Sequence, residues 1–197
     1  MKSNVCKIKK GELNLSPLLE ETEKVAKYNE LSDKNALVLR LLAEELVSML
    51  PAIVSKFDGE FWVVNEGLYY ELCVKIFVEH MDLMTRERLI QVSKENRNSA
   101  VVGVSGRIRA MFEYMAMSGD AGMVASAGRY NLSSNIDFSQ IWSMRNYRES
   151  TKAEAGEDTE QWDEFERSIL VKIADDVVVG VKHKNVNIII KKTFEQN

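Results

Sequence analysis

Hydrophobic and polar residues alternate, or recur at helical spacing, along the first third of the chain. The alternation over residues 4–9 predicts a short β-strand. Ser16-Pro17 predicts a helix start, with the serine as N-cap and the proline in the first turn. The clearest helix follows from Asp33, its expected N-cap, and Pro51 bends or closes it. The expected apolar stripe of this helix is Leu37, Leu41, Leu42, Leu46, Met49, Leu50 and Ile53.

A β-hairpin is predicted next. Asp58-Gly59 predicts a turn, residues 61–64 form a strand-like apolar run, and residues 65–67 form a second turn. From Leu68 the chain alternates strictly, so two sets of side chains lie on opposite faces of a strand, one of them in the core. The two sets are Leu68, Tyr70, Leu72, Val74, Ile76 and Val78, and Tyr69, Glu71, Cys73, Lys75, Phe77 and Glu79.

The rest of the chain mixes helical patterns with stretches of small or polar residues. Helices are predicted over residues 85–92, 108–115, 136–147 and 162–173. Loops are predicted over residues 101–106, 119–128 and 149–161. The end of the chain predicts two strands, at 177–179 and 186–190, separated by a turn.

This order of elements predicts the fold class. Most strand connections are hairpins, so the sheet is expected to be mixed but mostly antiparallel, and the amphipathic helices are expected to cover one of its faces. The result is an α/β (α+β) two-layer sandwich. We expect one domain over residues 1–197, with an insertion or lid-like region at about 118–158.

Composition excludes several classes of protein. The chain has 26 Lys and Arg against 30 Asp and Glu, so its net charge of −4 argues against a generally basic nucleic-acid binder. Cys6 and Cys73 are the only cysteines, too few for a structural zinc site, and Cys73 is expected to be a small buried hydrophobe. No apolar run approaches the roughly 18 residues of a membrane span, and we expect a cytoplasmic protein.

Three segments together resemble a known family. Residues 40–49 read RLLAEELVSM and carry a Glu-Glu pair on the long helix. The hairpin and helix over 61–92 follow, and near the end Ile173-Ala174-Asp175 precedes two strands. This arrangement resembles the histidine-kinase-like ATPase (Bergerat, GHKL) fold and, within it, the bacterial anti-sigma-factor serine kinases.

The resemblance implies a nucleotide site and shows where this chain departs from it. Glu45 corresponds to the family's general base, but Met49 stands where the family has its Mg²⁺-binding asparagine, and a thioether is no ligand for that hard cation. Glu79 or Asp82 would provide the carboxylate that contacts adenine, although the glycines of that motif are missing. Gly103, Gly106 and Arg107 before a predicted helix partly match the family's phosphate-binding loop.

Each candidate residue also has a purely structural interpretation. Glu45 is also explained, and more simply, as a solvated helix carboxylate or as an ion-pair partner of Arg40. Asp82 is explained as a helix N-cap, and His80 as a structural residue at a strand end rather than a general base. The pair Gly103 and Gly106 is weak evidence by itself.

Two further stretches mix residue types found at binding surfaces. The cations and aromatic rings of Trp142, Arg145, Tyr147 and Arg148 would suit an anion or RNA surface. Four methionines would suit either a core or an adaptable partner surface; they are Met111, Met115, Met117 and Met123.

The sequence therefore leads to three hypotheses. The first is a divergent, catalytically impaired histidine-kinase-like ATPase that binds another protein, a sigma factor or an anti-sigma antagonist by resemblance, with no direct nucleic-acid or membrane contact and with a homodimer as an option. The second is an active ATP- and Mg²⁺-dependent serine/threonine protein kinase of the anti-sigma type. The third is an unrelated α/β structural or scaffold module.

Overall fold

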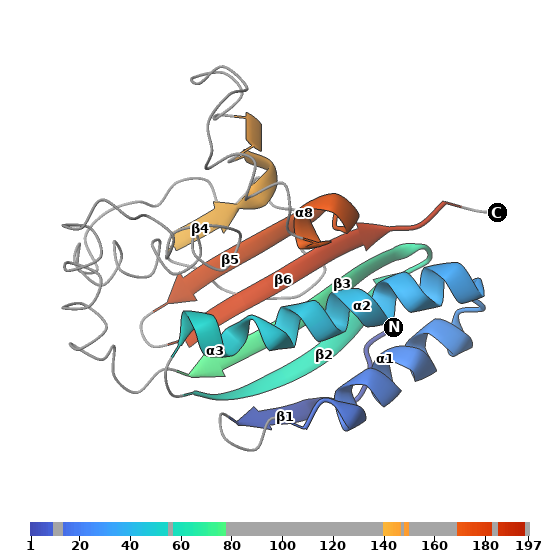
Figure 1. Cartoon of the computed structure of the whole chain (residues 1–197), viewed down its shortest axis with the longest axis horizontal. Helices are drawn as coiled ribbons and strands as arrows, with labels where there is room; N and C mark the ends of the chain where they lie inside the picture. Colours follow the sequence, from blue (N-terminus) through green and yellow to red (C-terminus); the bar gives the residue numbers. More distant parts are fainter. Residues whose placement is uncertain are drawn as a thin grey trace.

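The computed structural model describes residues 1–9, 14–54, 57–77, 140–146, 148–149, 169–182 and 185–195. Within them, six strands form one sheet in the order β1-β2-β3-β6-β5-β4, and every neighbouring pair is antiparallel (Figure 1). The strands are β1 Cys6–Lys9, β2 Asp58–Glu66, β3 Tyr69–Phe77, β4 Gln140–Ser143, β5 Asp176–Lys182 and β6 Asn185–Thr193.

The described helices pack on one face of this sheet. They are α1 Ser16–Tyr28, α2 Asp33–Ser48, α3 Leu50–Ile53 and α8 Ile169–Ile173. Helix α1 packs over β2, and α2 packs over β3 and β6 and against α8 (Figure 1). The main core lies between the two layers, which confirms the predicted α+β two-layer sandwich.

Helix α2 turns a different stripe into the core from the one predicted. Leu37, expected inside, is 66% exposed, whereas Leu39 is fully buried. The buried residues of α2 and of the first position of α3 are Leu39, Leu42, Ala43, Leu46, Val47 and Leu50. The predicted stripe was therefore right in its centre and wrong at its start, because Leu37 lies about 200° around the helix from Leu39 and faces solvent.

The helix ends also differ in detail from prediction. Ser32, not Asp33, caps α2, because its hydroxyl accepts from the Asn35 N–H at 3.4 Å. Ser16 makes no cap of α1; its own N–H donates to the Asn14 side chain at 3.1 Å. Pro51 lies in the first turn of α3, where its missing N–H costs no helical hydrogen bond.

The end of α1 is a Schellman motif. The Glu30 N–H donates to Lys27 O at 3.1 Å, and the Leu31 N–H donates to Ala26 O at 3.0 Å. Glu30 has φ 52, the left-handed conformation that this motif requires and that glycine adopts most easily. The motif reverses the chain within a few residues and places α2 beside α1.

The β2–β3 hairpin is confirmed, with nine residues paired on each strand. Gly67 opens its two-residue loop with φ 58, a conformation typical of a primed hairpin turn. The turn expected at Asp58-Gly59 is wrong: both residues lie within β2, opposite Phe77 and Ile76. Glycine is required at position 59 by space, because a Cβ there would lie 2.7 Å from both Ile76 Cγ2 and Lys75 O.

The prediction of a helix was also wrong over residues 140–143, which form strand β4. The docked helix expected over 136–147 is a strand at Gln140–Ser143, paired with β5 at the sheet edge. The chain then turns helical under two polar caps: Ser143 Oγ accepts from the Asn146 N–H at 3.3 Å, and Asp176 accepts from the Arg145 N–H at 3.0 Å. Part of the region expected to be an insertion thus belongs to the sheet.

No helix within the described ranges is long and apolar enough to cross a membrane. The predicted elements at 85–92, 101–106, 108–115, 119–128 and 150–161 lie outside the described residues.

Candidate functional site

The residue expected to act as a general base, Glu45, lies in the last turns of α2 and is half-buried. Four positions later, Met49 ends the helix, and its N–H donates to Glu45 O at 3.1 Å. The Met49 side chain is half-buried and packs against the main core. The turn from Glu45 to Met49 therefore offers the Glu45 carboxylate, but Met49 packs against the core and provides no oxygen ligand for a cation.

The ion pair suggested between Glu45 and Arg40 is not formed. Arg40 instead pairs with Glu23 of α1, with 2.6 Å between Nη1 and Oε1. Both partners of that pair are about half exposed, so the pair joins two helices at the surface and contributes little to stability.

The fold brings the Glu45 turn to the end of the sheet at which β3 ends. Helix α3, directly after the Glu45 turn, lies at that end, where β3 finishes at Phe77 and β2 begins (left in Figure 1). Glu79 and Asp82 follow β3 in the chain. Glu79, Asp82, Gly103, Gly106 and Arg107, together with His80, lie outside the described residues.

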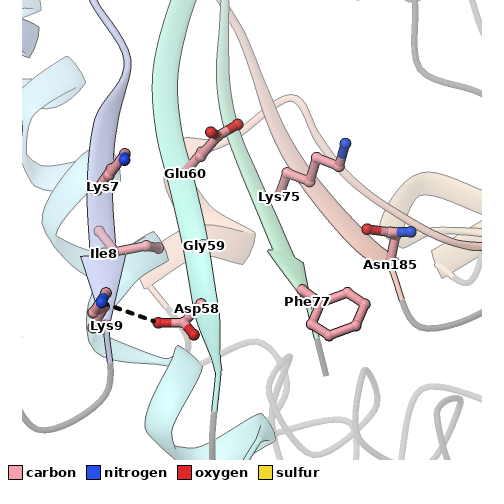
Figure 2. A pocket seen from close by; sticks show the side chains of 9 residues that line it. All are labelled: Lys7, Ile8, Lys9, Asp58, Gly59, Glu60, Lys75, Phe77 and Asn185. Atoms are coloured by element: carbon pink, nitrogen blue, oxygen red, sulfur yellow. Dashed lines mark ion pairs between the residues drawn. The ribbon is translucent and has the colours of Figure 1, made fainter. Parts of the chain in front are cut away.

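A shallow depression of about 340 Å³ lies at the same end but on the sheet face opposite the helices (Figure 2). Ile8 of β1 faces the core, so its neighbours Lys7 and Lys9 lie on the opposite face. The antiparallel register places two rows of side chains there. One row is Lys9, Asp58, Phe77 and Asn185, and the other begins Lys7, Glu60 and Lys75.

The charges in this depression are only partly compensated. Lys9 and Asp58 form an ion pair at 3.9 Å, and both side chains are well over half exposed. Lys7 and Lys75 lie on either side of Glu60 in the register but form no ion pair with it or with any other described residue. The Phe77 ring is 44% exposed at the end of its strand.

Toward the opposite end, the same sheet face carries buried polar groups. Glu71, Lys191 and Asp176 are cross-strand neighbours on β3, β6 and β5, and both carboxylates are at least 95% buried. The Tyr69 hydroxyl donates to Glu71 Oε1 at 2.7 Å. Burial, with this hydrogen bond, raises the pKa of Tyr69 far above its ordinary range. Ser143 Oγ lies 3.0 Å from each carboxylate oxygen of Asp176.

Both cysteines are free thiols. Cys73 is fully buried beside Trp62, as expected for a small hydrophobe. Cys6 is half-buried, and burial raises the pKa of its thiol, so it is a weak nucleophile at neutral pH. In the part of the chain that the structure describes, no three His, Cys, Asp or Glu side chains gather closely enough to hold a metal ion.

The arginine and aromatic residues suggested as an anion or RNA surface divide between different environments. Trp142 is half-buried and packs against the main core, whereas Arg145 is exposed and Arg148 is half-buried. Tyr147 lies outside the described residues, as do the four methionines of residues 111–123.

Of the six residues that the sequence suggests for a nucleotide pocket, only Glu45 lies within the described residues. The sequence did not indicate the depression, because its side chains come from four strands. A periodic lysine pattern in β1 was the available signal. No protein-family model, no curated protein and no solved structure matches the chain.

Proposed function

We propose that the protein is a divergent member of the histidine-kinase-like ATPase fold that regulates by binding another protein, with its catalytic capacity impaired. The observation that carries this proposal is the Glu45–Met49 turn of α2. The general-base position keeps its carboxylate, but the position of the magnesium ligand carries a thioether packed against the core. Without that oxygen ligand, Mg²⁺ and the triphosphate it neutralises lose a defined site.

The arrangement of elements supports the choice of fold. The described chain runs strand, two long helices, the short α3, hairpin, the edge strand β4, and a closing helix followed by a hairpin; apart from α3 and β4, this is the order on which the resemblance rests. A shared pocket would require the Glu45 turn and the residues after β3 to lie at one end of the domain. The last turns of α2 and the end of β3 do lie at the same end (Figure 1).

An active kinase is the second candidate, and one observation favours it. Glu45 is half-exposed at this end and forms no ion pair with a described residue, so its carboxylate is available to accept a proton from a nucleophile.

Thermal unfolding with and without millimolar ATP–Mg²⁺, with ADP as a second ligand, separates the two candidates. A ligand at about 100 times its Kd stabilises by about 2.7 kcal/mol, or about 5–10 °C in a chain of this size. We expect no shift with either nucleotide. The same scan is made on Glu45→Ala and on Glu44→Ala, the exposed neighbour that serves as a matched control. A shift in the unmodified chain, together with phosphotransfer that Glu45→Ala abolishes and Glu44→Ala keeps, would establish a working nucleotide pocket and overturn the proposal, because a general base is needed for proton transfer rather than for nucleotide binding.

A further inference from the structure

We infer that the depression at the end of the sheet face opposite the helices is the partner-binding surface, and that its partner is an acidic polypeptide segment carrying an aromatic or large apolar side chain. This inference rests on the proposed function, because it names the surface through which a regulatory module would bind another protein. It uses none of the residues assigned to the nucleotide pocket.

The depression carries an excess of unpaired positive charge. Three ammonium groups and two carboxylates line the depression, so it carries a net charge of +1 in a chain whose net charge is −4. Lys7 and Lys75 form no ion pair with a described residue, and the Lys9–Asp58 pair is long and exposed. Such a pair exchanges its partner at little cost. The site can therefore accept carboxylates from a partner without breaking a strong internal contact.

The depression also presents an exposed aromatic ring. Phe77 is 44% exposed, and its ring lies between Asp58 and Asn185 in the cross-strand row (Figure 2). An exposed phenyl ring adds nothing to the core, but it supplies the apolar contact on which interface affinity usually depends. Along β3, Phe77 and Lys75 are two residues apart, about 7 Å at the rise of a strand. That spacing matches alternate side chains of an extended segment lying along the strand.

Negative and positive side chains are mixed on this surface. Asp58 and Glu60 lie between the lysines, which disfavours a uniformly negative polyanion such as a nucleic-acid backbone. A polypeptide can place an acidic residue against Lys7 and Lys75 and an apolar residue against Phe77, while leaving the carboxylates in water. The surface thus selects by pattern rather than by total charge.

The test measures binding of fluorescently labelled polypeptides to the full chain at low and at high salt. The probes are a random glutamate–tyrosine copolymer, polyglutamate, a lysine–tyrosine copolymer and single-stranded oligouridylate. We expect the glutamate–tyrosine copolymer to bind best and its affinity to fall as salt is added, because exposed charges are screened.

Variants locate the binding. The double variant Lys7→Glu and Lys75→Glu should weaken it at least about tenfold, since two attractive contacts become repulsive. The matched control is Lys27→Glu with Lys34→Glu, two exposed lysines on the helix side. Phe77→Ala should weaken binding about threefold or more. Leu37→Ala, another exposed apolar residue, should have no effect.

Four outcomes would overturn the inference. They are no binding of the glutamate–tyrosine copolymer, equal loss in the control double variant, equal affinity for polyglutamate, and tighter binding of oligouridylate. If the binding test gives one of these results, the proposed function is not contradicted, but the partner-binding surface must lie elsewhere on the protein. A nucleotide-dependent thermal shift with phosphotransfer that requires Glu45 overturns the proposed function instead, so the two failures are distinguishable.

Discussion

Replacing Gly59 by alanine tests how tightly the first three strands are packed. The new Cβ would lie 2.7 Å from Ile76 Cγ2, 2.7 Å from Lys75 O and 3.2 Å from Ile8 Cγ1. Ordinary contact begins at 3.4 Å, so β2 and β3 must separate by about 0.7 Å. The Ile76 methyl group can move with its side chain, but Lys75 O belongs to the backbone of the paired strand and moves only with the hairpin.

The magnitude follows from two opposing terms. Overpacking in a well-packed region costs about 1–3 kcal/mol, and contact with backbone favours the upper half of that range. Alanine also restricts the unfolded chain, which returns about 0.4–1 kcal/mol. The net loss should be about 2 kcal/mol in the free energy of unfolding, or about 4–8 °C in Tm for a chain of this size.

Urea unfolding followed by tryptophan fluorescence measures this loss, and Gly67→Ala is the control in the same hairpin. A Cβ at position 67 meets nothing within 4 Å, so only the left-handed backbone is strained there. That strain should cost about 1 kcal/mol. If Gly59→Ala loses no more stability than Gly67→Ala, the close approach of the three strands is not as described.

Two further substitutions should stabilise the protein, and the same unfolding assay checks both. Tyr70→Phe removes a fully buried hydroxyl that has no hydrogen-bond partner, so the free energy of unfolding should rise by about 1 kcal/mol; a loss of that size would show that the hydroxyl is in fact satisfied. Glu30→Gly relieves a left-handed backbone at the end of α1 and should add about 0.5–1 kcal/mol, after the entropy lost in the unfolded chain is subtracted. A destabilised Glu30→Gly variant would indicate that the glutamate side chain contributes more than its backbone strain costs.

The hairpin and the last strand could be predicted from the sequence because apolar residues recur at every second position, although both faces of β3 and β6 are buried over most of their length. A period of two over nine residues can place its apolar set on only one face, so Leu72 and Ile188 were assigned to strands with little ambiguity. The centre of α2 was predictable because its apolar residues recur with a period near 3.6, which indicates a helix with one buried face. Leu37 was misassigned because α2 has apolar residues on both sides at its start, and Leu39, about 200° around the helix from Leu37, is the one that faces the core.

The errors arose where distant residues decide the local structure. Asp58-Gly59 has the composition of a turn, but the space at Gly59 is limited by Ile8 and Ile76 from two other strands. Residues 140–143 could form either a helix or a strand locally, and pairing with β5 decides between them. Single-sequence periodicity carries no information about such pairing.

The candidate site was predictable only in part. Glu45 was correctly placed on a helix, but its suggested partner Arg40 binds Glu23, which is far away in sequence and adjacent in space. The depression could not have been assembled from the sequence at all. Nothing in the sequence distinguishes Lys7, Lys75 and Asn185 from other strand residues. Only the order of the strands in the sheet places them on one face.

The central β3–β6 pairing has a consequence for how the protein folds. Each outer hairpin closes locally, but Phe77 and Asn185, paired at the centre, are more than a hundred positions apart in the chain. Joining the two hairpins therefore requires a loop closure that costs about 4 kcal/mol in chain entropy before the central ladder forms. That step should limit the folding rate. Because the cost grows only logarithmically, about 0.6 kcal/mol for each doubling of length, an insertion between the hairpins that leaves β4 and α8 intact should have little effect on stability.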